Sequence, residues 1–157
     1  MPCGRLVCLT VAALFLGAAD APAQGSTDNP LREITSLSCT FSLQASGSWV
    51  DGEPSAAVKQ AGVLSLRFID IDTAESTAEV VGVSSNDIVV QLSGWNLHFL
   101  DIRPAGSLSI TTVFGQESRD GKLKAVHSRT DYLPVSIPGF AAQPDAFQYY
   151  GECEIGQ

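Results

Sequence analysis

The stretch FQYYGECEI, residues 147–155, alternates between two kinds of side chain along its whole length. One set is mostly apolar and comprises Phe147, Tyr149, Gly151, Cys153 and Ile155, with polar or tyrosine side chains between them. This period of two is typical of a half-buried β-strand. The sequence therefore predicts a last strand that carries Cys153 on its apolar face.

A second alternating stretch begins at Leu37, near the other end of the chain. Its predicted apolar face consists of Cys39, Phe41, Leu43, Ala45, Gly47 and Trp49. A disulfide between Cys39 and Cys153 requires their Cα atoms to lie within about 7 Å of each other. The two terminal strands must then lie side by side or face each other across the core.

Between these strands, six more segments show the same period, and short turn signals separate them. They span residues 64–72, 77–83, 88–92, 97–102, 108–114 and 122–130, and one side of 108–114 carries Leu108, Ile110, Thr112 and Phe114. About eight antiparallel strands predict an all-β fold, either a small barrel or a β-sandwich. A meander whose first and last strands are adjacent favours the barrel, because closure removes the exposed sheet edges.

The chain divides into three predicted parts. Residues 1–23 resemble a signal peptide, with one positive charge, an apolar run over 6–19 and an A-x-A cleavage site at 21–23. Residues 24–36 are predicted to be a flexible lead-in, and residues 37–157 a single β domain. The protein is expected to be exported, to the periplasm or the extracellular space, with no membrane span after the leader is cleaved.

Export simplifies the interpretation of the cysteines. Cys3 and Cys8 fall within the predicted leader, so the mature chain would retain Cys39 and Cys153. Two cysteines in an oxidising compartment usually pair. A zinc site or a free catalytic thiol is the alternative, but neither a C-x-x-C motif nor an accompanying base is evident.

The composition is acidic, with a formal net charge of −8 and lysine only at positions 59, 122 and 124. Nucleic acids and anionic membrane surfaces attract clusters of lysine and arginine. The charge balance therefore argues against nucleic acid as a partner.

Histidine offers the main candidate for catalysis. His127, within the stretch AVHSR, suggests an acid–base group that works with a carboxylate such as Asp101 or Asp131. Ser128 cannot be its partner, because adjacent strand residues point to opposite faces. A structural role for His127 on its strand is the alternative interpretation. Closure into a barrel would also allow His98 and His127 to come together as part of a metal site.

Two further groups of residues suggest binding. Asp70, Asp72 and Glu75 form an acidic cluster at the end of a predicted strand, which would suit Ca²⁺ if both aspartates shared a face. The exposed aromatic candidates for a binding patch are Trp95, Tyr132 and Tyr150. Solvated acidic strand ends and scattered aromatic side chains are the simpler interpretations. The sequence predicts no cofactor.

Several short motifs resemble those of small exported bacterial proteins of uncharacterised function. They are LSCTF at 37–41, TTVF at 111–114, AVHSR at 125–129 and the terminal QYYGECEI at 148–155. The shared pattern is an early cysteine, a V-H-S-R strand and a final Y-x-G-x-C. The resemblance implies a bacterial, periplasmic protein and brings no catalytic residues with it.

The sequence thus predicts an exported envelope β-domain whose specific role it does not define. A non-enzymatic structural module, or a module that binds a small apolar ligand or an envelope protein, is favoured over an enzyme. Small barrels hold ligands in their mouths, which favours this function. The alternatives are a small hydrolase or isomerase that uses His127 with a carboxylate, and a structural protein stabilised by calcium.

Overall fold

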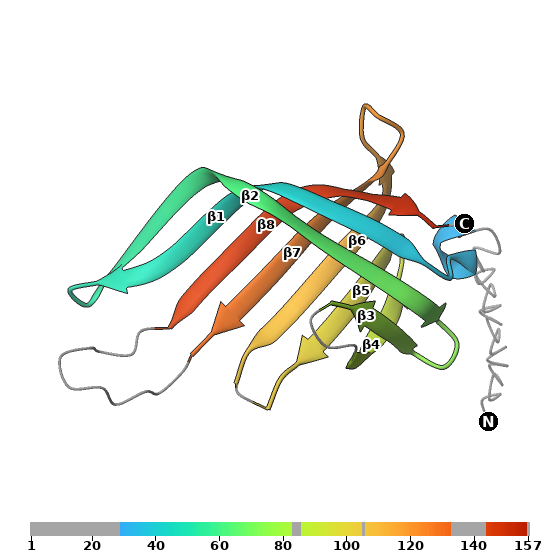
Figure 1. Cartoon of the computed structure of the whole chain (residues 1–157), viewed down its shortest axis with the longest axis horizontal. Helices are drawn as coiled ribbons and strands as arrows, with labels where there is room; N and C mark the ends of the chain where they lie inside the picture. The colour runs from blue at the N-terminus through green and yellow to red at the C-terminus, as the bar shows by residue number, and fades with distance from the viewer. Residues whose placement is uncertain (1–28, 83–85, 105, 133–143, 157) are drawn as a thin grey trace, which may run out of the picture.

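The computed structural model describes residues 29–82, 86–104, 106–132 and 144–156, and these form a closed antiparallel β-barrel (Figure 1). Its eight strands are β1 (Leu37–Val50), β2 (Glu53–Asp72), β3 (Thr77–Val81), β4 (Asn86–Ser93), β5 (Asn96–Ile102), β6 (Leu108–Glu117), β7 (Leu123–Asp131) and β8 (Asp145–Ile155). Each strand pairs with the next in sequence, and β8 returns to β1. The predicted all-β fold of about eight strands is confirmed, and of the two alternatives the barrel is the one observed.

The seam between β1 and β8 carries the predicted disulfide. Cys39 lies directly opposite Cys153 in the antiparallel register, with a Cα–Cα distance of 4.0 Å, and the two are disulfide-bonded. Both residues are buried in the barrel core. The link between the first and last strands is therefore confirmed. Disulfides of this kind are typical of oxidising compartments.

A short 3₁₀ helix, η1 (Pro30–Glu33), closes one end of the barrel. Asn29 caps it by accepting a hydrogen bond from the backbone N–H of Leu31, and its Nδ2 donates to the carbonyl oxygen of Gly94 at 2.6 Å. The Leu31 side chain is 1% exposed and packs in the core. The predicted flexible lead-in is therefore wrong for residues 29–36, because burial of Leu31 fixes this segment. Residues 24–28 and the predicted signal peptide lie outside the described residues.

A β-bulge in β1 changes which side chains face the barrel interior. The register shifts between Phe41 and Leu43 against both neighbouring strands. Beyond the bulge the buried residue is Gln44, whereas Trp49 is 43% exposed. The prediction that one apolar face continues from Cys39 to Trp49 is therefore wrong after Phe41, since one extra residue reverses the alternation.

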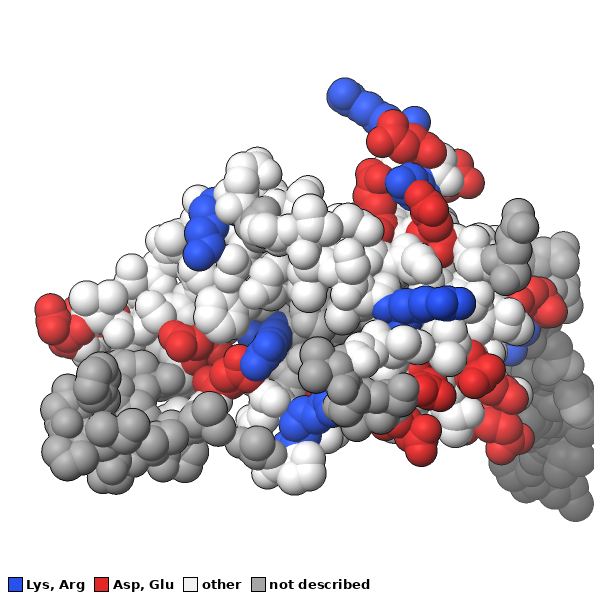
Figure 2. All heavy atoms as spheres, in the orientation of Figure 1, with Lys and Arg blue, Asp and Glu red and all other residues white. Residues whose placement is uncertain are grey.

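The β1–β2 hairpin extends past the rest of the barrel (Figure 1). The pairing of β2 with β3 covers only Arg67–Asp72 of β2, so the earlier part of this strand pairs with β1 alone within the described ranges. The visible surface of the hairpin is largely uncharged, whereas charged side chains gather on the projecting β6–β7 turn (Figure 2). Among the described residues, no helix has the length and apolar character needed to cross a membrane.

Candidate functional site

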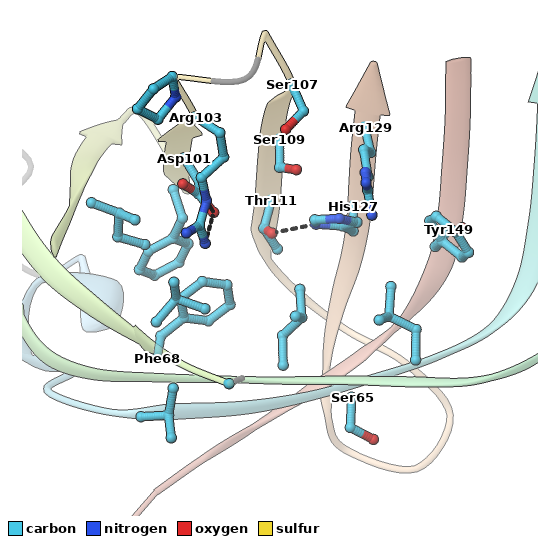
Figure 3. A pocket seen from close by; sticks show the side chains of 18 residues that line it. Ser65, Phe68, Asp101, Arg103, Ser107, Ser109, Thr111, His127, Arg129 and Tyr149 are labelled. Atoms are coloured by element: carbon cyan, nitrogen blue, oxygen red, sulfur yellow. Dashed lines mark hydrogen bonds and ion pairs between the residues drawn. The ribbon is translucent and has the colours of Figure 1, made fainter. Parts of the chain in front are cut away.

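The barrel interior has a packed end and a hollow end. Near η1 it is filled by apolar side chains, including Leu37, Phe41, Leu97 and Val113. Towards the other end lies a cavity of about 810 Å³ (Figure 3). Ligand cavities usually occupy ~300–1,000 Å³, and an eight-stranded barrel is wide enough to hold one small ligand. The stacked rings of Phe68 and Phe99, with centroids 4.1 Å apart, belong to the core and also line the cavity.

The cavity has two chemically different walls. On β2, β3 and β4 its lining side chains are apolar except for Ser65, and they include Leu64, Leu66, Phe68, Val80, Val81 and Ile88. On β5 to β8 most of them can form hydrogen bonds: Asp101, Ser109, Thr111, His127, Arg129 and Tyr149. Figure 3 shows Thr111 and His127 on one side of the cavity and Phe68 on the other.

His127 lies at the centre of the polar wall and is 7% exposed. Its Nδ1 atom is 2.8 Å from the Oγ1 of Thr111, the residue directly opposite on β6. The rings of Phe41 and Tyr149 each lie 5.9 Å away, centroid to centroid. Burial, and then the nearby positive charge of Arg129, lower the pKa of His127 to about 4. The imidazole is therefore neutral at neutral pH.

Two arginine–aspartate pairs flank the mouth of the cavity. Arg103 donates to Asp101 Oδ2 through both Nε, at 2.9 Å, and Nη2, at 2.7 Å. On β7, the Nε of Arg129 lies 2.7 Å from Asp131 Oδ2. Ser109 lies between them, because it is opposite Asp101 on one side and Arg129 on the other. Charge is thus confined to the open end of the polar wall.

The structure does not assemble the predicted acid–base pair. His127 is hydrogen-bonded to Thr111. Asp101 pairs instead with Arg103 in the turn after β5, and Asp131 pairs with Arg129 on β7. Nor does it bring the two histidines together. His98 bonds to Thr112 at 3.0 Å, on the outer side of the wall, because its neighbour Phe99 points inward.

The acidic cluster Asp70, Asp72 and Glu75 lies at the β2–β3 turn, next to a β-bulge. Asp70 has a positive φ of 50°, and the register shifts between Ile69 and Asp72. This bulge turns Ile71 into the core and leaves Asp70 and Asp72, on either side of it, exposed to solvent. Asp72 Oδ1 accepts the backbone N–H groups of Ala74, at 2.8 Å, and Glu75, at 2.9 Å. Asp72 therefore stabilises the turn.

No group of three or more histidine, cysteine, aspartate or glutamate side chains that could hold a metal ion occurs in the described part of the chain.

The three aromatic candidates lie on separate parts of the barrel. Trp95 is exposed in the β4–β5 turn at the closed end, where its carbonyl oxygen accepts the N–H of Gly115 at 2.6 Å. Tyr132 directly follows β7 at the open end. Tyr150 lies on the outer face of β8 and donates to Gln148 Oε1 at 2.8 Å. The structure does not bring them into one patch.

Most of the polar wall was not identified from the sequence. In β6 the apolar side, with Leu108 and Ile110, faces outward, and the hydroxyl-bearing side, with Ser109 and Thr111, lines the cavity. The available signal was the alternation of small hydroxyl side chains with apolar ones over 107–111. That pattern shows two faces but does not tell which one is internal.

The lowered pKa of His127 predicts a specific loss of stability in acid. The folded state resists protonation down to about pH 4, whereas the imidazole of an unfolded chain protonates near its ordinary pKa of 6.5. The unfolded state therefore binds more protons between these values, and the free energy of unfolding should fall by about 3 kcal/mol from pH 7 to pH 4 because of this residue. Urea unfolding at pH 7 and at pH 4 measures this difference in free energy.

The variant His127→Gln should lose less stability than the wild type over that interval. The carboxylates contribute to both proteins, so the difference between them isolates the imidazole. His98→Gln, on the outer face, controls for the loss of a histidine elsewhere on the barrel. Parallel losses in the wild type and His127→Gln would contradict the prediction.

Comparison of the chain with protein-family models, with curated proteins and with solved structures gave no match.

Proposed function

We propose that the protein is an exported, non-enzymatic binding module of the bacterial envelope, and that its barrel holds one small ligand with a substantial apolar surface. The observation that carries the proposal is the cavity of about 810 Å³ in a barrel that is otherwise closed and packed. A cavity bordered by an apolar wall and a few polar groups is the usual form of a small-molecule site.

The disulfide supports export, because such bonds persist in oxidising compartments. The leader-like pattern at residues 1–23 and the resemblance to small exported bacterial proteins agree with a periplasmic or extracellular location.

A hydrolase or isomerase based on His127 has less support. A general base needs a reacting proton within hydrogen-bond reach, and a catalytic histidine is usually oriented by a further group. The Nδ1 of His127 bonds to Thr111, and the two candidate carboxylates pair with arginines. If the protein is an enzyme, His127→Ala should abolish turnover while the fold persists. A binding module has no turnover to lose, so the absence of any His127-dependent turnover distinguishes it from an enzyme.

The first test of the proposed function is the mass of the protein purified gently from its native host. We expect the mass under native conditions to exceed the denatured mass by a fixed small-molecule increment. A doubled native mass would indicate assembly instead of ligand carriage. Equal masses would contradict carriage under those conditions.

The second test fills the cavity. Binding of N-phenyl-1-naphthylamine, a neutral apolar probe, is followed by fluorescence in the wild type and in Ser109→Trp. The indole ring would occupy the cavity mouth, so the affinity should fall about tenfold or more. Ser128→Trp, on the outer face of β7, is the matched control and should bind as the wild type does. Equal affinities in all three proteins would place the probe outside the barrel.

A further inference from the structure

The two walls of the cavity constrain the chemical class of the ligand more closely than the cavity volume does. Phe68, Val80 and Ile88 present apolar surface from β2, β3 and β4. Thr111 and His127 present hydrogen-bonding groups from β6 and β7 at a similar depth. Thr111 and His127 pair with each other through Nδ1, but a purely apolar molecule would cover the second ring nitrogen of His127 without pairing it. Buried polar groups left unpaired oppose binding.

The polar wall offers neutral groups inside, and its charges, the ion pairs Arg103–Asp101 and Arg129–Asp131, lie at the mouth. Thr111 bonds to Nδ1 of His127, which leaves Nε2 of the imidazole as a further hydrogen-bonding atom. Since that imidazole is neutral at neutral pH, hydroxyl or carbonyl groups suit it better than an ion. Hydroxyl groups of Ser109 and Ser107 continue the polar surface outward along the β6 side.

At the mouth, Arg129 has donors to spare for an anion. A guanidinium group carries five N–H donors in a planar fork. The contact with Asp131 is made through Nε, and the side chain is about half exposed. Arg103 lines the same opening from the turn after β5. A carboxylate at this position could accept bonds from Arg129 while the rest of the ligand lies deeper.

We infer that the ligand is a facially amphipathic carboxylate, and this inference rests on the proposed function. One face of its rigid skeleton is apolar and lies against β2–β4. The opposite face carries hydroxyl or carbonyl groups toward Thr111 and His127, and the acid group lies at Arg129. A flexible fatty acid has no polar face to offer the second wall. A rigid fused-ring acid with hydroxyls on one face satisfies both walls at once.

The test compares two acids of the same ring skeleton by isothermal titration calorimetry, below their micelle-forming concentrations. Cholate carries three hydroxyl groups on one face, and lithocholate carries one. The two-walled cavity should prefer cholate by about tenfold, the value of one or two additional hydrogen bonds. An apolar pocket would show the reverse order, because lithocholate is the more apolar compound.

Two substitutions locate the ligand in the cavity. Thr111→Val, which removes the hydroxyl at nearly constant volume, should reduce the preference for cholate, and Thr112→Val on the outer face should not. Arg129→Gln should weaken cholate by at least about tenfold but leave its neutral methyl ester unchanged, since only the acid forms a charge-assisted bond. Arg32→Gln, at the closed end, is the charge-matched control. Circular dichroism verifies that each variant is folded.

The outcomes separate this inference from the proposed function. Tighter binding of lithocholate, or an equal effect of Arg129→Gln on the acid and its ester, would overturn the two-walled carboxylate site. Binding of N-phenyl-1-naphthylamine without either acid would overturn it as well, while leaving the proposed function intact. Failure of all three compounds to bind would count against both.

Discussion

Replacing Gly151 with alanine should destabilise the barrel by about 4 kcal/mol or more, among the largest effects of a single substitution. A Cβ atom at this position would overlap the carbonyl oxygen of Thr40 and lie 2.6 Å from the Cα of Phe41. Both are backbone atoms of β1 at the bulge, so no side-chain rotation relieves the overlap. β8 would have to move away from β1 at the seam that closes the barrel.

The control for this experiment is Gly47→Ala in β1. The nearest atoms to a Cβ at Gly47 are carbonyl oxygens 4.0 Å away, so the methyl group fits. Urea unfolding of the wild type and both variants measures the free energies. Alanine generally suits a strand interior no worse than glycine, so Gly47→Ala should change stability by no more than about 0.5–1 kcal/mol. A similar small change for Gly151→Ala would show that β8 does not approach β1 this closely.

Removing the disulfide should have a comparable effect. Cys39 and Cys153 are separated by 114 residues, and their bond joins the first strand to the last. In the chain-entropy model, a cross-link over such a loop stabilises the folded state by up to about 5 kcal/mol. The double variant Cys39→Ala/Cys153→Ala should therefore lose about 3–5 kcal/mol in urea unfolding, which is a large part of the stability of a small domain.

Reduced wild-type protein separates the two parts of this loss. The thiols of the reduced protein still fill the core, so the difference in free energy of unfolding between the oxidised and reduced wild type measures the effect of the cross-link. The additional loss of stability in the double variant measures the effect of removing the sulfur atoms from the core. Alkylation of the denatured, unreduced protein should label neither Cys39 nor Cys153. Labelling of both thiols, or an unchanged urea midpoint after reduction, would contradict the prediction.

The candidate site was only partly predictable. His127 was selected because histidine is rare in this chain and has versatile chemistry, and the structure places it in the cavity wall. Its hydrogen-bond partner Thr111 is 16 residues away and was not selected. Which residues face each other on neighbouring strands depends on the register of the pairing, and the sequence of a single strand does not specify how its neighbour is aligned with it.

The sequence by itself predicted about eight antiparallel strands and the disulfide of this protein, and it favoured closure into a barrel over a sandwich. Alternation of side chains sets the strand faces locally, and two cysteines on the first and last apolar faces leave few arrangements that permit a bond. Tertiary structure alone decided which faces are internal beyond each bulge. The bulge after Phe41 turns Gln44 inward, and the one at Asp70 turns Ile71 inward.

The physical reason lies in the period of two. One extra residue exchanges inside and outside for the rest of a strand, and its position is set by how neighbouring strands fit when the barrel closes. At Gly151 the fit is tight enough to exclude a methyl group, which is a property of two strands far apart in sequence. The polar wall of the cavity also depends on how the strands fit together. The hydroxyl-bearing side of β6 faces the interior at the end of the barrel that apolar side chains do not fill.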